Sequence, residues 1–182
     1  MRLMAQLFLF LCCFIACCGS PNSSWALSPQ YQAAFQNGLR SIYDKHPRYK
    51  LGGNLEDGEI DCSELIRQGA IKGRLPGISK TRLQAWQIKR GHGGFAGVGV
   101  SNWKDGNTQV GDLLCIHIEN GLERPDDVNH ILAVILWNGI HQVMHASGSR
   151  HTVVIVPFQA WIEKALAGVE DGYRRMKLGD KP

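Results

Sequence analysis

The residues best suited to chemistry in this chain are one cysteine and two histidines. Cys62 follows a stretch rich in glycine and acidic residues, and His130 and His145 stand on apolar segments far downstream. A thiol nucleophile, an imidazole that accepts its proton and a group that orients the imidazole are the parts of a cysteine hydrolase. The sequence therefore predicts an enzyme of this class, with a packed core cysteine and two core histidines as the structural alternative.

Cys62 is expected to lie at the start of a helix. Small and apolar residues recur at helical spacing on one face of this segment, at Cys62, Leu65, Ile66, Gly69 and Ala70. Asp61 can cap the helix, and Glu64 three residues later completes the pattern of a capping box. The thiol then lies among unpaired N–H groups at the positive end of the helix dipole. Because these favour the thiolate, we expect the pKa of Cys62 to be lowered.

A predicted hairpin brings the two histidines together. Asn138-Gly139 is a strong signal for a two-residue turn between two apolar, strand-like segments. Pairing across this turn places His145 opposite Leu132, so His145 shares a face with His130 and is its diagonal neighbour. With about 7 Å between their Cα atoms, the two imidazoles can form the hydrogen bond that a base and its orienting partner require.

The rest of the pattern predicts one α+β domain. Helices are expected from Ser28-Pro29 to His46-Pro47, over 79–90, and from Pro157 onward with Trp161, Ala165, Leu166 and Val169 on one face. Strands are expected over 113–118, 131–137, 140–146 and 153–156, and loops over 49–60 and 91–109. Helices before the hairpin and strands around it are typical of a sheet packed against a helical part.

The first 26 residues have the features of a signal peptide. The apolar run Leu7–Cys18 is shorter than the about 20 residues that a transmembrane helix needs. Ser24 and Ala26 occupy the small-residue positions of a signal peptidase site. We therefore expect residues 27–182 to be an exported catalytic domain, periplasmic or secreted, without stable membrane insertion. Lipoprotein anchoring at Cys17 is the alternative.

Cysteine content and charge narrow the remaining classes. Outside the first 26 residues the cysteines are Cys62 and Cys115, and the apolar, strand-like surroundings of Cys115 favour a free thiol over a disulfide. No Cys/His spacing suggests zinc, and no cofactor is expected. The formal net charge of +4 comes without basic blocks interleaved with aromatic residues, so no nucleic-acid partner is expected. A monomer is expected.

Five motifs, in this order, resemble the NlpC-type family of cell-wall cysteine peptidases, which is papain-like in topology: Tyr49-Lys50-Leu51-Gly52-Gly53, Asp61-Cys62-Ser63, Gly111-Asp112-Leu113, His130-Ile131-Leu132-Ala133-Val134 and His145-Ala146-Ser147. The resemblance implies an antiparallel sheet packed against an N-terminal helical part. It implies Cys62 as nucleophile at a helix N-terminus, His130 as general base and His145 as orienting residue. It also implies that Tyr49, Asp61 and Ser63 bind substrate.

The same resemblance implies a substrate, namely the amide bonds of peptidoglycan stem peptides. The bond would be the γ-D-glutamyl–diaminopimelate bond or a cross-bridge, cut in wall remodelling or lysis. Three departures bear on substrate choice: Glu64 replaces a small glycine, the His130 strand reads His-Ile-Leu-Ala, and the 91–109 stretch is long. An N-acetylmuramoyl-L-alanine amidase or an interbacterial amidase toxin of the same fold is the alternative enzyme. An inert wall-binding module is the alternative without catalysis.

Overall fold

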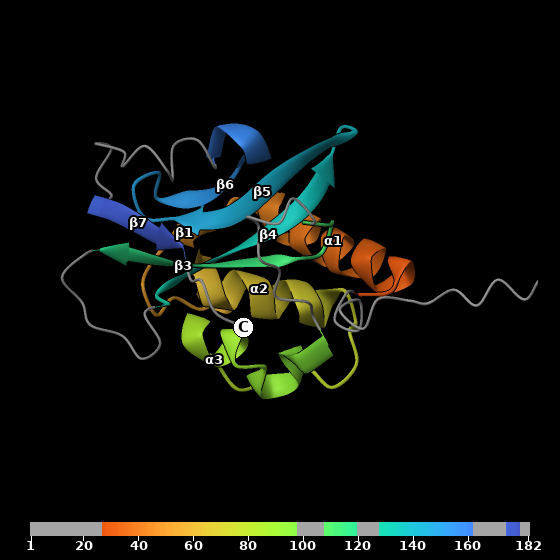
Figure 1. Cartoon of the computed structure of the whole chain (residues 1–182). Coiled ribbons are helices and arrows are strands. Elements are labelled where there is room, and N and C mark those ends of the chain that lie inside the picture. Colours follow the sequence, from red (N-terminus) through yellow and green to blue (C-terminus); the bar gives the residue numbers. More distant parts are fainter. Residues whose placement is uncertain (1–26, 98–107, 120–127, 162–173, 179–182) are drawn as a thin grey trace, which may run out of the picture.

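The computed structural model describes residues 27–97, 108–119, 128–161 and 174–178, which form a sheet with helices packed on it (Figure 1). The predicted signal segment 1–26, residues 98–107 of the 91–109 stretch, and positions Ala165, Leu166 and Val169 lie outside the described residues. Within the described ranges, no helix combines the length and the apolar character that crossing a bilayer requires.

A sheet of seven strands runs through the described part of the chain. In spatial order these are β2 (Glu59–Ile60), β1 (Arg48–Tyr49), β6 (Thr152–Pro157), β5 (Ile140–Ser147), β4 (His130–Trp137), β3 (Leu113–Glu119) and β7 (Arg174–Leu178). Neighbouring strands are antiparallel, except that β1 and β2 run parallel. The α+β class and the mainly antiparallel sheet expected from the sequence are confirmed.

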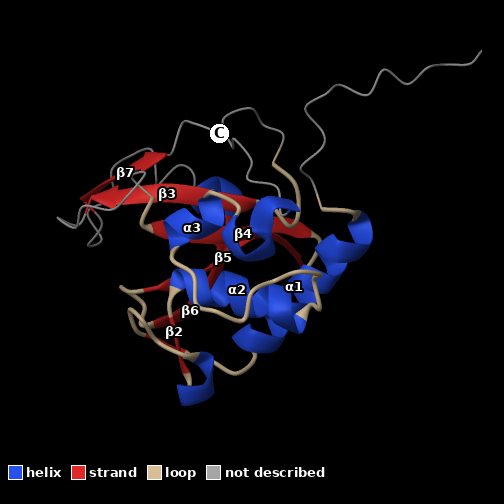
Figure 2. Cartoon of the chain, turned by 90° about the horizontal axis from the view of Figure 1, so that it is seen from below, coloured by secondary structure: helices blue, strands red, loops and turns tan. Residues whose placement is uncertain are grey.

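The helices α1 (Pro29–Tyr43), α2 (Cys62–Lys72) and α3 (Ala85–Lys89) lie together on one side of this sheet (Figure 2). α1 begins where the Ser28 hydroxyl accepts the N–H of Tyr31 at 3.4 Å, with Pro29 in the first turn, as the sequence predicts. Two short 3-10 helices, η1 (Leu55–Asp57) and η2 (His92–Gly97), complete the helical elements of the described residues.

Glycines allow α1 and α2 to approach each other closely. A Cβ atom at Gly38 would lie 2.0 Å from the carbonyl oxygen of Gly69, and one at Gly73 would lie 2.4 Å from that of Ala34. These oxygens belong to helical backbone, so they cannot move aside as a flexible side chain would. The contact fixes α2 against α1, and it thereby fixes the position of Cys62 at the start of α2.

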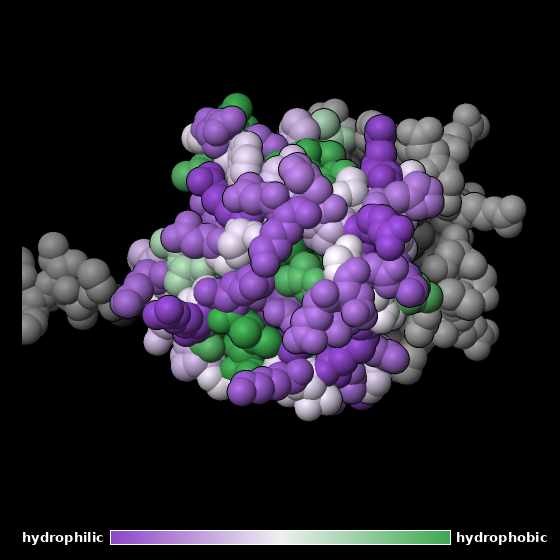
Figure 3. All heavy atoms as spheres, turned by 180° about the vertical axis from the view of Figure 1, so that it is seen from behind, coloured by the Kyte–Doolittle hydropathy of each residue, from purple (hydrophilic) through white to green (hydrophobic). Residues whose placement is uncertain are grey.

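Apolar side chains fill both faces of the sheet. The larger core, between the sheet and the helices, includes Phe35, Leu39, Leu65, Ile66, Ile131 and Ala133. The smaller core on the other face consists of Leu114, Ile116, Leu132, Val134, Val143 and Trp161. Successive residues of β4 thus alternate between the two cores, as the pleat of a strand requires. The molecular surface seen from behind is mostly hydrophilic, with small apolar patches (Figure 3).

The β4–β5 hairpin has the predicted register. Trp137 pairs with Ile140, and the two turn residues between them, Asn138 and Gly139, have φ values of 51° and 77°. Positive φ at both central residues is what a two-residue turn of this type needs, and Asn-Gly supplies it at low cost. The turn therefore sets which residues of β4 and β5 face each other.

The predicted helix over 79–90 is wrong in its first half, because only Ala85–Lys89 is helical. The carbonyl oxygens of Ser79 and Lys80 accept hydrogen bonds from the guanidinium of Arg67. A contact from α2 therefore holds this stretch in a bent, non-helical path.

Short elements were also missed. The predicted loop 49–60 contains η1 and the two-residue strands β1 and β2, which are too short to show a period of two in the sequence. β7 was not predicted. β6 includes Pro157, where a helix was expected to begin, and residues 158–161 are helical.

Candidate active site

Asp61 organises the start of α2. Its Oδ1 accepts hydrogen bonds from the N–H of Glu64 and from the hydroxyl of Ser63, both at 2.9 Å. This is the predicted N-cap. The returning half of the capping box is absent, because the Glu64 carboxylate binds Arg67 and Gln68 instead of the backbone of Asp61.

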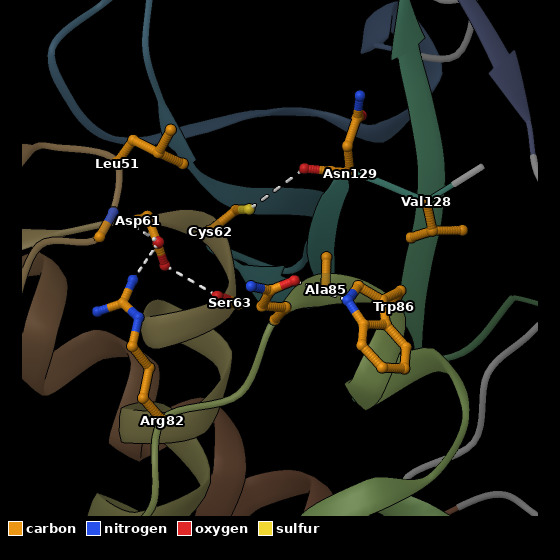
Figure 4. Close-up of a pocket in the computed structure, with 11 residues that line it drawn as sticks. Leu51, Asp61, Cys62, Ser63, Arg82, Ala85, Trp86, Val128 and Asn129 are labelled. Carbon is orange, nitrogen blue, oxygen red and sulfur yellow. Dashed lines mark hydrogen bonds and ion pairs between the residues drawn. The ribbon is translucent and has the colours of Figure 1, made fainter. Parts of the chain in front are cut away.

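Cys62 is the first residue of α2 and is only 6% exposed. Its Sγ donates to the carbonyl oxygen of Asn129 at 3.9 Å (Figure 4). Burial is the main cause that raises the pKa of the thiol to about 12; the Asp61 carboxylate acts in the same direction, and N–H groups of Ile131, Ser63 and Cys62 itself act against it. The predicted decrease is therefore wrong for this state, because loss of hydration outweighs the helix terminus.

His130 and His145 form the predicted pair. Nε2 of His130 and Nδ1 of His145 are 3.0 Å apart, and the two rings are nearly perpendicular, at 87°. Burial lowers the pKa of His130 well below its usual value, and the nearby His145 lowers it further. Burial also lowers the pKa of His145 to about 4, against a hydrogen bond to Ala146 that raises it. Both rings are therefore neutral at pH 7, and Nδ1 is the His130 nitrogen outside this bond.

The thiol and the histidine pair meet at the start of β4. Asn129 and Ile131, whose backbone groups interact with the Cys62 sulfur, are the chain neighbours of His130. The thiol thus lies against the backbone on both sides of His130. The hydrogen bond of the thiol runs to the Asn129 carbonyl oxygen and not to an imidazole, so no hydrogen bond links Cys62 to His130 in this structure.

A pocket of about 220 Å³ opens beside Cys62. Its lining comes from four segments: Leu51-Gly52, Asp61–Ser63, Arg82 with 84–86, and Val128-Asn129. Figure 4 shows the Cys62 side chain pointing toward Asn129, with Leu51 and Trp86 at opposite sides. Polar groups from the start of α2 and apolar groups from the loops thus share one opening.

The remaining residues that the resemblance implicated lie in different places. Asp61 and Ser63 line the pocket. Tyr49 is not among the lining residues described, and its ring packs near Gly148, where a Cβ would be 3.3 Å from the ring. His130 and His145 are each 7% exposed and do not line the pocket either.

Arg82 supplies the positive charge of the pocket, and no motif in the sequence indicates it. Its guanidinium forms an ion pair with Asp61 Oδ2 and donates to the carbonyl oxygen of Gly53 at 2.7 Å. The N–H of Gly52 donates to the same Asp61 oxygen at 3.1 Å. Since Arg82 is twenty-one residues from Asp61, no local pattern could have indicated the pair.

The described residues contain no group of three or more His, Cys, Asp or Glu side chains that could hold a metal ion. Cys62 and Cys115 are both free thiols. Burial also raises the pKa of Cys115 to about 12. Cys115 belongs to β3, within the larger core, where it acts as a small apolar residue.

Comparison with known proteins gives a structural likeness. No family model and no curated protein matches this chain. The solved structure of NlpC2 from Trichomonas vaginalis is similar, with 21% sequence identity and a TM-score of 0.46. The match covers 72% of this chain and 42% of that one, so the chain spans less than half the length of that protein.

Proposed function

We propose that this protein is a cysteine hydrolase that cleaves amide bonds in peptidoglycan stem peptides. Cys62 is the nucleophile, His130 the general base and His145 the residue that orients His130. The observation that carries the proposal is the buried His130–His145 hydrogen bond. It occupies Nε2 of His130 and leaves Nδ1 for a proton, while the thiol rests against the backbone on either side of the same histidine.

The reaction begins from a neutral thiol and a neutral imidazole. When substrate enters, the Sγ–H exchanges the Asn129 carbonyl for Nδ1 of His130, which takes the proton as sulfur attacks the scissile carbonyl carbon. N–H groups at the start of α2 stabilise the oxyanion. The imidazolium then protonates the leaving amine, and water activated by His130 releases the acyl group from sulfur.

The charges of the pocket support a peptide substrate with ionised ends. Arg82 presents a guanidinium that is 37% exposed at the pocket. A stem peptide carries free carboxylates, and this guanidinium can pair with one of them. Export of residues 27–182 after removal of residues 1–26 belongs to the same proposal, with Cys17 anchoring as the alternative.

Trp86 favours an N-acetylmuramoyl-L-alanine amidase as the second candidate. Its indole lines the pocket, and the flat apolar face of an indole suits the ring of a sugar next to the bond that an amidase cuts. An inert wall-binding module has no need of a thiol beside a hydrogen-bonded histidine pair.

The test is digestion of purified muropeptides, read by mass spectrometry. We expect cut stem peptides, abolished in Cys62→Ala and retained in Cys115→Ala, which removes the other described thiol. Release of whole stems with a free lactyl group on the sugar would identify the amidase. Absence of both products with folded protein would refute the peptidoglycan substrate.

A further inference from the structure

Glu64 is a buried carboxylate with no part in the proposed chemistry. It is 1% exposed, and both of its oxygens bind the same guanidinium: Oε2 accepts from Arg67 Nε at 2.8 Å and Oε1 from Arg67 Nη2 at 2.6 Å. Oε1 also accepts from Gln68 at 2.9 Å. This bidentate ion pair holds the Arg67 side chain in a single orientation along α2.

The third nitrogen of Arg67 reaches out of the helix. Nη1 donates to the carbonyl oxygen of Lys80 at 2.7 Å and lies 3.4 Å from that of Ser79. Both carbonyls belong to the stretch that was expected to be helical. The Glu64–Arg67 pair therefore ties the 79–84 segment to the first two turns of α2.

Arg82, two residues after Lys80, belongs to the same segment and lines the pocket. Arg82 pairs with Asp61, and Asp61 in turn accepts the N–H of Glu64 at 2.9 Å. The contacts form a closed circuit, from Asp61 through Glu64 and Arg67 to Lys80 and back through Arg82. A shift of the 79–84 segment would consequently draw Arg82 away from Asp61 and from the thiol.

We propose that Glu64 and Arg67 are positioning residues that hold the Arg82 guanidinium beside Cys62 and so set the charge of the pocket. A buried ion pair is weak evidence for stability alone, because the loss of hydration offsets the attraction. A role in fixing one arrangement of the 79–84 segment accounts for its burial and for the third Arg67 contact. The inference rests on the proposed function only in taking Cys62 as the reactive thiol.

The test compares two alkylating reagents on Cys62 at pH 9, with the modified peptide identified by mass spectrometry. Iodoacetate is an anion and iodoacetamide is neutral, and both react with the thiolate, so their rate ratio cancels the thiolate fraction. Arg82→Gln removes the local positive charge and is expected to lower the iodoacetate-to-iodoacetamide ratio about fivefold.

Variants of Arg67 and Glu64 test whether this pair acts by positioning Arg82 or only through the charge of Glu64. Arg67→Lys keeps the charge but cannot serve both Glu64 and the Lys80 carbonyl, and we expect a fall in the ratio of about two- to threefold. Glu64→Gln is expected to lower it as well. If Glu64 acted only through its own charge, removing that charge would attract the anionic reagent and raise the ratio. A rise in Glu64→Gln, or an unchanged ratio in Arg67→Lys, overturns the proposal.

Two controls separate positioning from folding. Arg40→Lys makes the same exchange on α1, where Arg40 binds the Leu136 carbonyl, and it should leave the ratio unchanged. In the Arg82→Gln background, Arg67→Lys should have no further effect on the ratio, because the charge it positions is gone.

Amide hydrogen exchange measures the order of the 79–84 segment without using the reactivity of Cys62. We expect faster exchange of the 80–84 amides in Arg67→Lys, with exchange in α1 unchanged. If Cys62 is alkylated too slowly at pH 9 for the rate ratio to be measured, hydrogen exchange still decides the positioning role. Unchanged exchange over 80–84 would then refute it.

Discussion

The histidine pair and the thiol, which we propose to be the base and the nucleophile, are prepared for this chemistry to different degrees. The pair already has the hydrogen bond that an oriented base needs, 3.0 Å long and buried. The thiol is bound to a backbone carbonyl oxygen, and burial raises its pKa to about 12. The hairpin register thus brings the two proposed catalytic histidines together, whereas burial keeps the proposed nucleophile protonated in the resting protein.

The sharpest test of this contrast removes the thiol. Cys62→Ala is expected to abolish hydrolysis, because the proposed acyl intermediate forms on the Cys62 sulfur. Folding should be nearly unaffected, since the change removes one small group. Product formation and thermal melting measure the two effects, and Cys115→Ala is the matched control. Residual turnover near that of the unaltered protein would exclude Cys62 as nucleophile.

The second test asks whether the resting thiol is really protonated. With a pKa near 12 in place of an ordinary value near 8.5, the thiolate fraction at pH 7.5 is about 10³-fold smaller than in a free cysteine. Iodoacetamide should therefore alkylate Cys62 slowly, with a rate that still climbs above pH 10. A plateau below pH 8 would instead show a thiolate–imidazolium pair and would remove the contrast drawn above.

Unequal losses are expected within the histidine pair. His130→Ala removes the base and should lower kcat about 10³-fold, whereas His145→Ala removes only its orientation and should cost about 10- to 100-fold. His145→Asn keeps a hydrogen-bonding group and should recover part of the loss. Steady-state kinetics on one muropeptide would measure all three, and equal, mild losses would contradict the assigned roles.

The last test concerns stability against acid and not turnover. The pKa of His145 is about 4 in the folded protein against about 6.5 when exposed. Between these values the unfolded chain binds a proton that the native state does not, so stability is complete above pH 6.5 and declines as the pH falls toward 4. The loss is about 3 kcal/mol. Urea unfolding of the unaltered protein and of His145→Gln at both pH values would show it as a steeper decline in the former.

The sequence predicted best where neighbours along the chain decide the structure. The Asn138-Gly139 turn fixed the β4–β5 register, and the register alone brought His130 to His145. Asp61 capped α2 as expected because the cap lies within three residues. In each case a short stretch of chain contains both the signal and its consequence.

Prediction failed where distant segments meet. The pKa of Cys62 depends on burial under β4, which no spacing near residue 62 reveals. The path of residues 79–84 depends on Arg67, and the charge of the pocket on Arg82 meeting Asp61. Glu64 stands at the capping-box position, as the sequence indicates, but its carboxylate binds the Arg67 guanidinium instead of the backbone N–H of Asp61. Tertiary contacts override propensity at these positions.

The glycine contact between α1 and α2 has a consequence for how the proposed hydrolase can change. Gly38 and Gly73 face carbonyl oxygens of the opposite helix, where even a methyl group would collide. Loops around the pocket could vary without disturbing this contact. Any side chain at Gly38 or Gly73 would instead displace α2, the helix that carries Cys62, from α1. Libraries meant to change specificity should therefore vary the residues that line the pocket and keep Gly38 and Gly73 unchanged. The residues that could change specificity lie around the start of α2, whereas the contact that holds this helix in place lies near its end.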